Sequence, residues 1–223
     1  LNVNYVPELK WYLVVEQTED VALEGIRQTL DANLAISLVV TLIVIFLTYL
    51  AIGHYQSKIE EMASTDKLTG LLNRHAFAIL VDKLMATYRR NPIPVTVLLG
   101  DVDHFKQIND HYGHRVGDQV LASGAGLLRS NLRATDFAVR WGGEEFLVVL
   151  TECAAEEGKL IAEKLRLAIE NATPCPTQAQ LRVTISFGLC QFDGVESIEQ
   201  TVNRADNALY AAKAAGRNSI RTA

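Results

Sequence analysis

The sequence has no excess of positive charge. Its 21 lysines and arginines are outnumbered by 26 aspartates and glutamates, which gives a formal net charge of -5. A nucleic-acid groove built on bulk positive charge is therefore disfavoured, whereas a nucleotide held through a metal ion is not. We accordingly expect no nucleic-acid partner.

Cysteine is scarce, and the sequence has neither an internal repeat nor a low-complexity tract. The three cysteines, Cys153, Cys175 and Cys190, are odd in number and show no CxxC spacing. This pattern predicts reduced thiols, and hence a reducing compartment for residue 153 onward. The chain starts at Leu1 rather than Met, so we expect it to be a piece of a longer protein.

Charge is missing altogether from residues 32–53, ANLAISLVVTLIVIFLTYLAIG. About 20 apolar positions suffice to cross a bilayer, and a signal peptide would have a shorter apolar core behind a basic leader. We predict one transmembrane helix here. The alternative is a buried core helix, which seldom stays apolar on all faces for this length. The basic residues on the two sides of the span are too evenly balanced to predict its orientation.

The segments flanking the span are short. Residues 1–31 contain a strand-like run, WYLVVEQ, and then a helical pattern; they resemble the end of an extracytoplasmic Cache-type sensor. Residues 54–64 form a connecting helix with Tyr55, Ile59 and Met62 on one stripe. That stripe fits either a short coiled coil between protomers or a simple amphipathic connector.

From residue 65 to 223 helices and strands alternate. We predict helices over 74–90, 116–131, 155–171 and 197–215, and strands over 95–102, 136–141, 145–150, 182–190 and 218–223. The strands DFAVRW and EFLVVL are expected to pair as a hairpin across Gly142 and Gly143. The pattern predicts one α/β (α+β) domain in which helices flank a mixed central sheet.

Carboxylates gather at two points of this sheet. Asp101 and Asp103 end the apolar strand 95–102, and Glu144 and Glu145 occupy the hairpin tip. A carboxylate at a buried strand end is costly unless it is paired or holds a cation. Hard oxygen ligands suit Mg²⁺ or Mn²⁺, which share their remaining positions with substrate phosphates. The alternative for the hairpin pair is plain solvated charge.

Other residues near these carboxylates fit a nucleotide. Gly142 and Gly143 would permit a tight turn and let a nucleotide lie against the backbone. An Asp carboxylate such as Asp118 accepts two N–H bonds, which matches the N1 and N2 donors of guanine. Lys213 and Arg217 are spaced i, i+4, so both cations can reach one triphosphate; the alternative is a solvated basic face at a helix end.

Four ordered motifs resemble the GGDEF domain, the catalytic domain of diguanylate cyclases. They are TDKLTGLLNR (65–74), DVDHFKQINDHYGHRVGD (101–118), RWGGEEF (140–146) and ADNALYAAKAAGRN (205–218). The resemblance implies a fold similar to the nucleotidyl cyclase and polymerase palm. It also implies condensation of two GTP into cyclic di-GMP, by 3′-oxygen attack on an α-phosphate with pyrophosphate leaving.

The resemblance implies a role for each matching position. Asp101, the backbone of Val102 and Glu144 would hold two Mg²⁺ (or Mn²⁺) ions per active site; Glu144 would also assist deprotonation of the 3′-hydroxyl, and Glu145 would support the metal site. The implied substrate-binding residues are Asn73 and His114 near the base or ribose, Asn109 and Asp118 at guanine, Gly142 and Gly143 at the signature, and Lys106, Lys213 and Arg217 at the phosphates.

The resemblance further implies a homodimer, because each domain holds one GTP and two must face each other. The catalytic domain would be cytoplasmic, where GTP is, and anchored in the bacterial inner membrane. RATD, from Arg133 to Asp136, matches the family's RxxD product-inhibition site; the alternative is an i, i+3 surface ion pair.

Other functions stay open. The chain could be a non-catalytic receptor for GTP or cyclic di-GMP, although degenerate domains usually lose the carboxylates that are present here. It could also use adenine nucleotides, although relatives that do so carry a smaller polar residue where Asp118 stands. Zinc at His104, His111 and His114 is disfavoured, because Asp, Lys and Asn between them fit a nucleotide better.

Overall fold

The computed structural model describes residues 2–8, 10–15, 19–62 and 64–223. The chain divides into two compact units, Leu1–Glu60 and Glu61–Ala223. The N-terminal unit holds an antiparallel hairpin, β1 (Asn2–Val6) and β2 (Trp11–Val15), and most of the long helix α1 (Glu19–Met62). The strand predicted over WYLVVEQ is confirmed as far as Val15, and its last two residues lie outside the described part; β1 was not predicted.

One stretch of α1 is long and apolar enough to cross a membrane. It covers Gly25–Ile52, with a mean hydropathy of 2.7. None of this stretch is buried within the chain, and Phe46, for example, is 61% exposed. This disfavours the buried core helix and fits the span predicted at 32–53 by length and composition. The side chains of residues 53–63 are outside the described part, and so is the stripe expected there.

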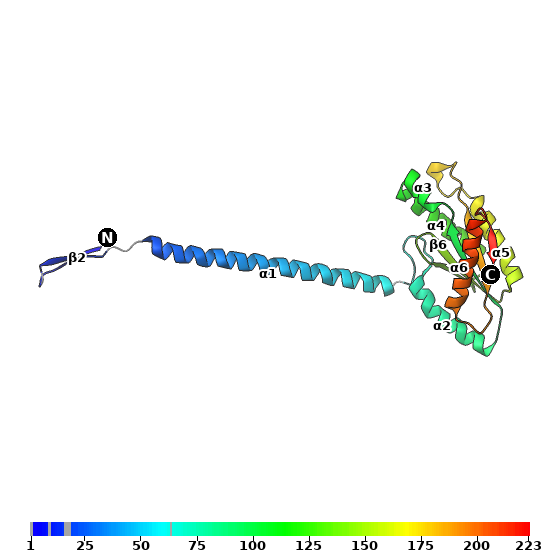
Figure 1. The fold of residues 1–223 in the computed structure, drawn as a ribbon, viewed down its shortest axis with the longest axis horizontal. Coiled ribbons are helices and arrows are strands. Elements are labelled where there is room, and N and C mark those ends of the chain that lie inside the picture. Colours follow the sequence, from blue (N-terminus) through cyan, green and yellow to red (C-terminus); the bar gives the residue numbers. More distant parts are fainter. Residues whose placement is uncertain (1, 9, 16–18, 63) are drawn as a thin grey trace. The chain divides into compact units, whose positions relative to one another are not determined.

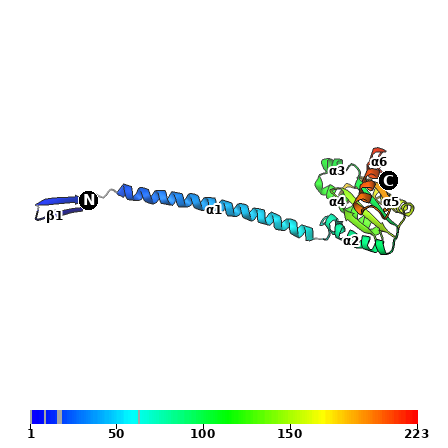
Figure 2. The ribbon, with the colours of Figure 1, turned by 60° about the horizontal axis from the view of Figure 1, so that its bottom comes forward.

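The C-terminal unit is a six-stranded mixed sheet with helices around it (Figures 1 and 2). Its elements in chain order are β3 (Leu72–Asn73), α2 (Arg74–Arg90), β4 (Val95–Val102), α3 (Phe105–Tyr112), α4 (His114–Asn131), β5 (Phe137–Arg140), β6 (Glu145–Thr151), α5 (Ala155–Glu170), a short 3-10 turn (Pro176–Gln178), β7 (Ile185–Gln191), α6 (Ile198–Ala214) and β8 (Ile220–Thr222). The strand order is β3-β5-β6-β4-β7-β8. The central pairs are antiparallel, and the outer pairs β3–β5 and β7–β8 are parallel. The predicted fold class is therefore confirmed; α3 and β3 were not predicted.

Period-two alternation along β4 divides the core between the two faces of the sheet. Leu98 packs in a cluster with residues of α3, α4 and α5, whereas Val97 and Leu99 pack with residues of α2 and α6. Every residue of β4 is buried, because helices cover both faces. Asp101, near the end of this central strand, is therefore also buried, with 8% of its surface exposed.

Helix α6 lies unusually close to β7. A Cβ on Gly188 of β7 would overlap the backbone oxygen of Ala205 and the backbone nitrogen of Leu209, so only glycine permits this approach. The helix begins with a capping box, in which the Ser197 side chain accepts from the Gln200 backbone and the Gln200 side chain accepts in return. Glycine and cap together fix the helix that carries Lys213 towards the end of β4.

The three cysteines are free thiols and all are buried in the C-terminal unit. No pair of them forms a disulfide, as expected from their number and spacing.

Candidate active site

The signature hairpin meets the end of β4. Asp101 lies opposite Glu145 of β6 and, on its other side, opposite Ser186 of β7. The Val102 backbone nitrogen donates to the Glu144 backbone oxygen at 3.3 Å. Strand pairing therefore brings the carboxylates at the end of β4 together with those at the hairpin tip.

Asp101 is buried, with 8% of its surface exposed. Its Oδ2 atom lies 2.8 Å from the Nζ atom of Lys213, which α6 supplies. Burial raises the pKa of the Asp101 carboxyl, the Lys213 ammonium opposes this, and the nearby charge of Glu144 adds to the increase. A cation beside such a carboxylate favours its charged form, as Lys213 does here and as a bound metal ion would.

Glu145 folds back over the glycines of the turn. A Cβ on Gly142 would lie 2.5 Å from the Glu145 Oε2 atom, whereas one on Gly143 would meet nothing within 4 Å. The turn between β5 and β6 is short, and the Trp141 backbone nitrogen donates to the Glu145 backbone oxygen at 2.9 Å. Neither glycine has a positive φ angle, so the backbone conformation of this turn does not by itself require glycine. The open space over Gly143 still allows a ligand to approach the backbone. Burial, and then the charge of Asp101, raise the pKa of Glu145.

A contact that the sequence did not reveal holds the signature turn. Arg140 donates from Nη1 to both carboxylate oxygens of Asp66 at 3.1 Å, and from Nη2 to the Gly143 backbone oxygen at 2.9 Å. Asp66 also accepts from the backbone and hydroxyl of Thr69. The first motif, TDKLTGLLNR, is thereby tied to the signature. An aspartate at the start of one motif and an arginine at the start of another were the only signals of this pair.

The donors near Asp101 fit a hard divalent cation. Asp101 and Glu144 supply carboxylate oxygens and Val102 supplies a backbone oxygen, which is the chemistry that Mg²⁺ and Mn²⁺ prefer. Within residues 2–8, 10–15, 19–62 and 64–223, no three His, Cys, Asp or Glu side chains come close enough to hold an ion by themselves. The site therefore offers fewer protein ligands than a closed metal site, and other ligands would have to complete the coordination.

Asp103 does not belong to this donor set. It is 3% exposed and accepts from the Thr184 and Ser186 hydroxyls and the Asn218 backbone nitrogen. These three bonds satisfy the carboxylate, so the cost of burying it is met by pairing rather than by a metal.

The expected guanine residues lie where α3 meets α4. The Asn109 side chain packs against Gly117, where a Cβ would overlap its Oδ1 atom, and Asp118 is the next residue. The Asn109 Oδ1 atom is buried and has no hydrogen-bond partner in the described chain. A buried acceptor without a donor is costly, and a ligand N–H group would satisfy it. His114 starts α4 beside Gly113, and its side chain is exposed.

The remaining expected residues are placed as follows. Lys106 is exposed in the first turn of α3, and Arg217 is exposed in the turn between α6 and β8. Asn73 caps α2, its side chain accepting from the Ala76 backbone nitrogen at 2.8 Å. The structure thus gives Asn73 a structural task in addition to the nucleotide contact expected of it.

The segment RATD does not form the i, i+3 ion pair that was the alternative to a product-inhibition site. The Asp136 carboxylate accepts from the backbone nitrogens of Arg133 and Thr151, and so closes the turn before β5. The Arg133 side chain instead contacts Glu157 of α5, with Nη2 to Oε1 at 3.0 Å. Arg133 and Asp136 also line a cavity of about 460 Å³ together with Arg129.

Comparison with known proteins agrees with this geometry. Residues 63–219 match the family described as "Diguanylate cyclase, GGDEF domain". The chain is 43% identical over 166 residues to diguanylate cyclase DgcP of Pseudomonas aeruginosa, and 41% identical over 163 residues to response regulator PleD of Caulobacter vibrioides. These alignments cover 73% and 72% of this chain, but only 24% and 36% of the relatives.

A solved structure supports the same relationship. The GGDEF domain of DgcB from Caulobacter crescentus, in complex with c-di-GMP, superposes with a TM-score of 0.68 at 33% identity. The superposition covers 72% of this chain and 95% of that domain.

Proposed function

We propose that this chain, which belongs to the diguanylate cyclase GGDEF-domain family, condenses two GTP into cyclic di-GMP and two pyrophosphates. The observation that carries the proposal is the convergence of Asp101, the signature carboxylates and Lys213 at one end of β4. The active GGEEF domain of a diguanylate cyclase from Vibrio cholerae, whose structure is solved, has the same Glu-containing form of the signature and is 31% identical.

Cyclases of this family generally depend on a metal ion, and two Mg²⁺ or Mn²⁺ ions per site are proposed here. Asp101, the Val102 backbone oxygen and Glu144 would hold them. When bound, such ions neutralise phosphate charge and make the 3′-hydroxyl more acidic. Glu144 assists removal of the proton from that hydroxyl, and Glu145, whose side chain lies against Gly142, supports the metal site.

The other side chains bind and orient GTP. Asp118 accepts from the N1 and N2 groups of guanine, and Asn109 offers its buried, unpartnered Oδ1 atom beside them. His114 and Asn73 contact the base or ribose. Lys106, Lys213 and Arg217 bind the phosphates and stabilise the charge that develops as pyrophosphate leaves.

Catalysis requires two such domains facing each other, because each holds one GTP. We place the catalytic unit in the cytoplasm and α1 across the bacterial inner membrane, with residues 1–31 outside. The apolar stretch Gly25–Ile52 supports a span. Reporter fusions after Gly53 and within the N-terminal segment test this topology, and a periplasmic signal from the former contradicts it.

We also propose product inhibition at Arg133 and Asp136. The cavity that they line carries a second arginine, Arg129, and two arginines suit the phosphates and guanine edges of cyclic di-GMP. The DgcB complex supports product binding by a related domain.

The decisive experiment is incubation of the full chain with GTP and Mg²⁺, followed by chromatography of the products. Cyclic di-GMP and pyrophosphate are expected. Binding of GTP without turnover would instead favour the non-catalytic receptor, and equal use of ATP would contradict the guanine assignment. A Glu144→Gln variant, which keeps the side-chain shape but removes the charge, is the control for contaminating activity.

A further inference from the structure

The turn that carries Arg217 has a costly backbone conformation. The φ angles are 115° at Gly216, 65° at Arg217 and 44° at Asn218, so three consecutive residues are left-handed. This region is disfavoured for any residue with a Cβ. Two such residues in succession persist only where the surroundings hold them.

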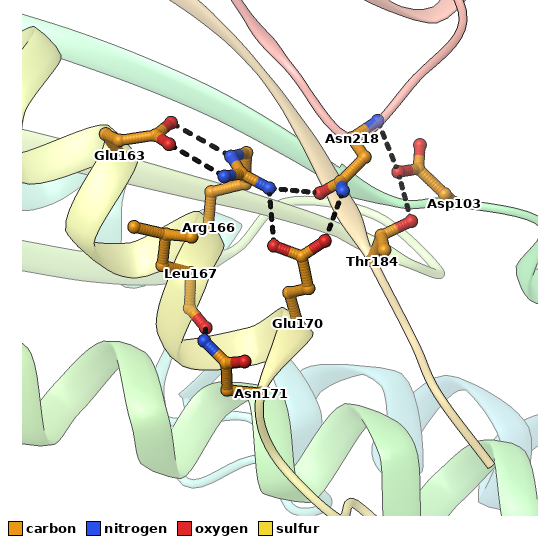
Figure 3. A network of polar contacts seen from close by, with 8 residues as sticks. All are labelled: Asp103, Glu163, Arg166, Leu167, Glu170, Asn171, Thr184 and Asn218. Carbon is orange, nitrogen blue, oxygen red and sulfur yellow. Dashed lines mark hydrogen bonds and ion pairs between the residues drawn. The ribbon is translucent and has the colours of Figure 1, made fainter.

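Asn218 is hydrogen-bonded through its backbone nitrogen and through both polar atoms of its side chain (Figure 3). Its backbone nitrogen donates to Asp103 Oδ2 at 3.0 Å, its Oδ1 accepts from Arg166 Nη1 at 2.6 Å, and its Nδ2 donates to Glu170 Oε1 at 2.7 Å. One residue is thereby fixed between the end of β4 and helix α5. Its side chain has one acceptor and one donor, and α5 supplies the partner of each, Arg166 and Glu170.

The partners of Asn218 make further hydrogen bonds of their own. Asp103 is anchored to the segment entering β7 and to β7 itself through Thr184 and Ser186, at 2.7 and 2.8 Å. Arg166 donates to both carboxylate oxygens of Glu163, at 2.9 and 2.7 Å, and to Glu170 at 2.9 Å. Hydrogen bonds donated by Asn218 and then by Arg166 hold the pKa of Glu170 below its ordinary value.

Stability alone does not account for this network. The Arg166 side chain is 11% exposed, but its partners Glu163 and Glu170 are 46% and 36% exposed, and ion pairs so open to solvent add little to stability. Helix α5 already packs through Ala162, Leu165 and Ile169. Arg166 hydrogen-bonds to Glu163, Glu170 and Asn218. Unlike a leucine, it can therefore fix the orientation of the turn that contains Asn218.

The position of the Arg217 side chain depends on the orientation of this turn. Its side chain is exposed and has no ion pair with any residue whose placement the structure describes. The backbone of the turn therefore sets the direction in which the Arg217 side chain leaves the chain, and so the region that its guanidinium can reach. Lys213, one helical turn earlier, is in contrast already held at Asp101.

We propose that Arg166 is a positioning residue, which through Asn218 fixes the left-handed turn and so presents Arg217 to the GTP phosphates. This rests on the proposed function of the site. The effect is on nucleotide affinity, and it passes through Arg217.

The test is a double-mutant cycle on the full chain in detergent, with Kd measured for guanosine 5′-(α,β-methylene)triphosphate, which cannot release pyrophosphate. Arg166→Gln and Arg217→Ala should each weaken binding about tenfold, the scale of one lost charge-assisted phosphate contact. Because the two residues act in series, the double variant should bind no more weakly than Arg217→Ala. The matched control is Arg204→Gln, which breaks the Arg204–Glu196 pair at the other end of α6 and should change Kd less than twofold.

A second variant separates positioning from folding. Asn218→Gly accepts the left-handed conformation without strain but lacks the side chain that contacts α5. It should melt within a few degrees of the parent and yet bind the analogue as weakly as Arg166→Gln. Parent-like affinity in Asn218→Gly overturns the positioning role, as does a double variant whose losses multiply. A parent that binds the analogue but makes no cyclic di-GMP refutes the cyclase proposal and leaves this one standing.

Discussion

The Nζ atom of Lys213 lies 2.8 Å from the Oδ2 atom of Asp101, so a proposed phosphate ligand is paired with a proposed metal ligand. Burial raises the pKa of this carboxyl, and Lys213 is the cation that opposes the effect. A bound metal would take over that neutralisation, which would free Lys213 for a phosphate. Metal and nucleotide binding are therefore expected to be coupled through this pair.

The coupling predicts the behaviour of Asp101→Asn. Excess Mg²⁺ should raise the melting temperature of the parent, because a ligand that binds only the folded state stabilises it. The variant should show no such rise, and its cyclase activity should fall by orders of magnitude, since metal-assisted charge stabilisation carries several kcal/mol. Melting curves with and without Mg²⁺ measure the first effect. An undiminished Mg²⁺ shift in a folded Asp101→Asn protein would rule out this carboxylate as a ligand.

Base selection provides a second prediction. Asp118→Ser removes the acceptor proposed for the guanine N–H groups, while Gly117 and the packed Asn109 side chain beside it stay in place. Discrimination between GTP and ATP should fall by about 1–3 kcal/mol, the cost of one unpaired buried partner. The ratio of kcat/KM for the two nucleotides measures it. Unchanged discrimination would mean that another residue recognises the base, and Asn109 would be the next candidate.

Much of this architecture could be predicted from local pattern. The strand over Val95–Val102 has the predicted bounds, because an apolar run ends there at Pro94 and at the aspartates. Helix α3 was missed because its sequence, FKQINDHY, is polar and ends at Gly113; burial of Phe105 and Ile108 stabilises it as a helix. Strand β3 has two residues and carries no periodicity at all.

Some residues of the candidate site could likewise be predicted from local pattern, and others could not. The end of a strand and the tip of a hairpin are visible in sequence, so Asp101 and Glu144 could be proposed from it. The contact between Asp66 and Arg140 joins residues 74 positions apart, and that between Arg166 and Asn218 joins residues 52 apart. Neither pair shares a local motif, so only the folded chain reveals them.

The Asp66–Arg140 contact makes stability depend on pH. Burial raises the pKa of Asp66, but hydrogen bonds from Thr69 and Arg140 outweigh this and leave it below its ordinary value. A carboxyl whose pKa is lowered by folding stabilises the protein fully above its unfolded pKa, about 3.9, and loses that contribution as pH falls through the folded value. Asp66→Asn should therefore destabilise the chain by about 1–3 kcal/mol at pH 7 and by less at pH 3. Urea unfolding at both pH values checks the sign, and an equal difference at both would exclude a role for the charge.

Buried thiols provide an independent check of the packing. Burial, and then the charge of Glu157, raise the pKa of Cys153 to about 11. At pH 8 only about one Cys153 in a thousand is then a thiolate, the reactive form. Iodoacetamide should label this residue far more slowly in the native chain than in urea, as peptide mass spectrometry can measure. Equal rates would mean that the β6–α5 connection is open to solvent.

The last prediction concerns Arg133, whose side chain is held by Glu157 rather than by Asp136. Both members of this pair are exposed, at 59% and 47%, so the contact contributes at most about 1 kcal/mol to stability. If cyclic di-GMP binds at Arg133, it must displace Glu157, and variants of the two members of this pair should then change product inhibition in opposite directions. Arg133→Ala should abolish the slowing seen as product accumulates, whereas Glu157→Gln should strengthen it severalfold, because the competing charge is gone. Allosteric coupling is typically about 1–3 kcal/mol, so both changes are measurable in progress curves with added cyclic di-GMP. Glu156→Gln, on the same helix turn, is the matched control for a lost negative charge. Identical inhibition in parent, Arg133→Ala and Glu157→Gln would reduce RATD to a turn closed by Asp136, with no part in regulation.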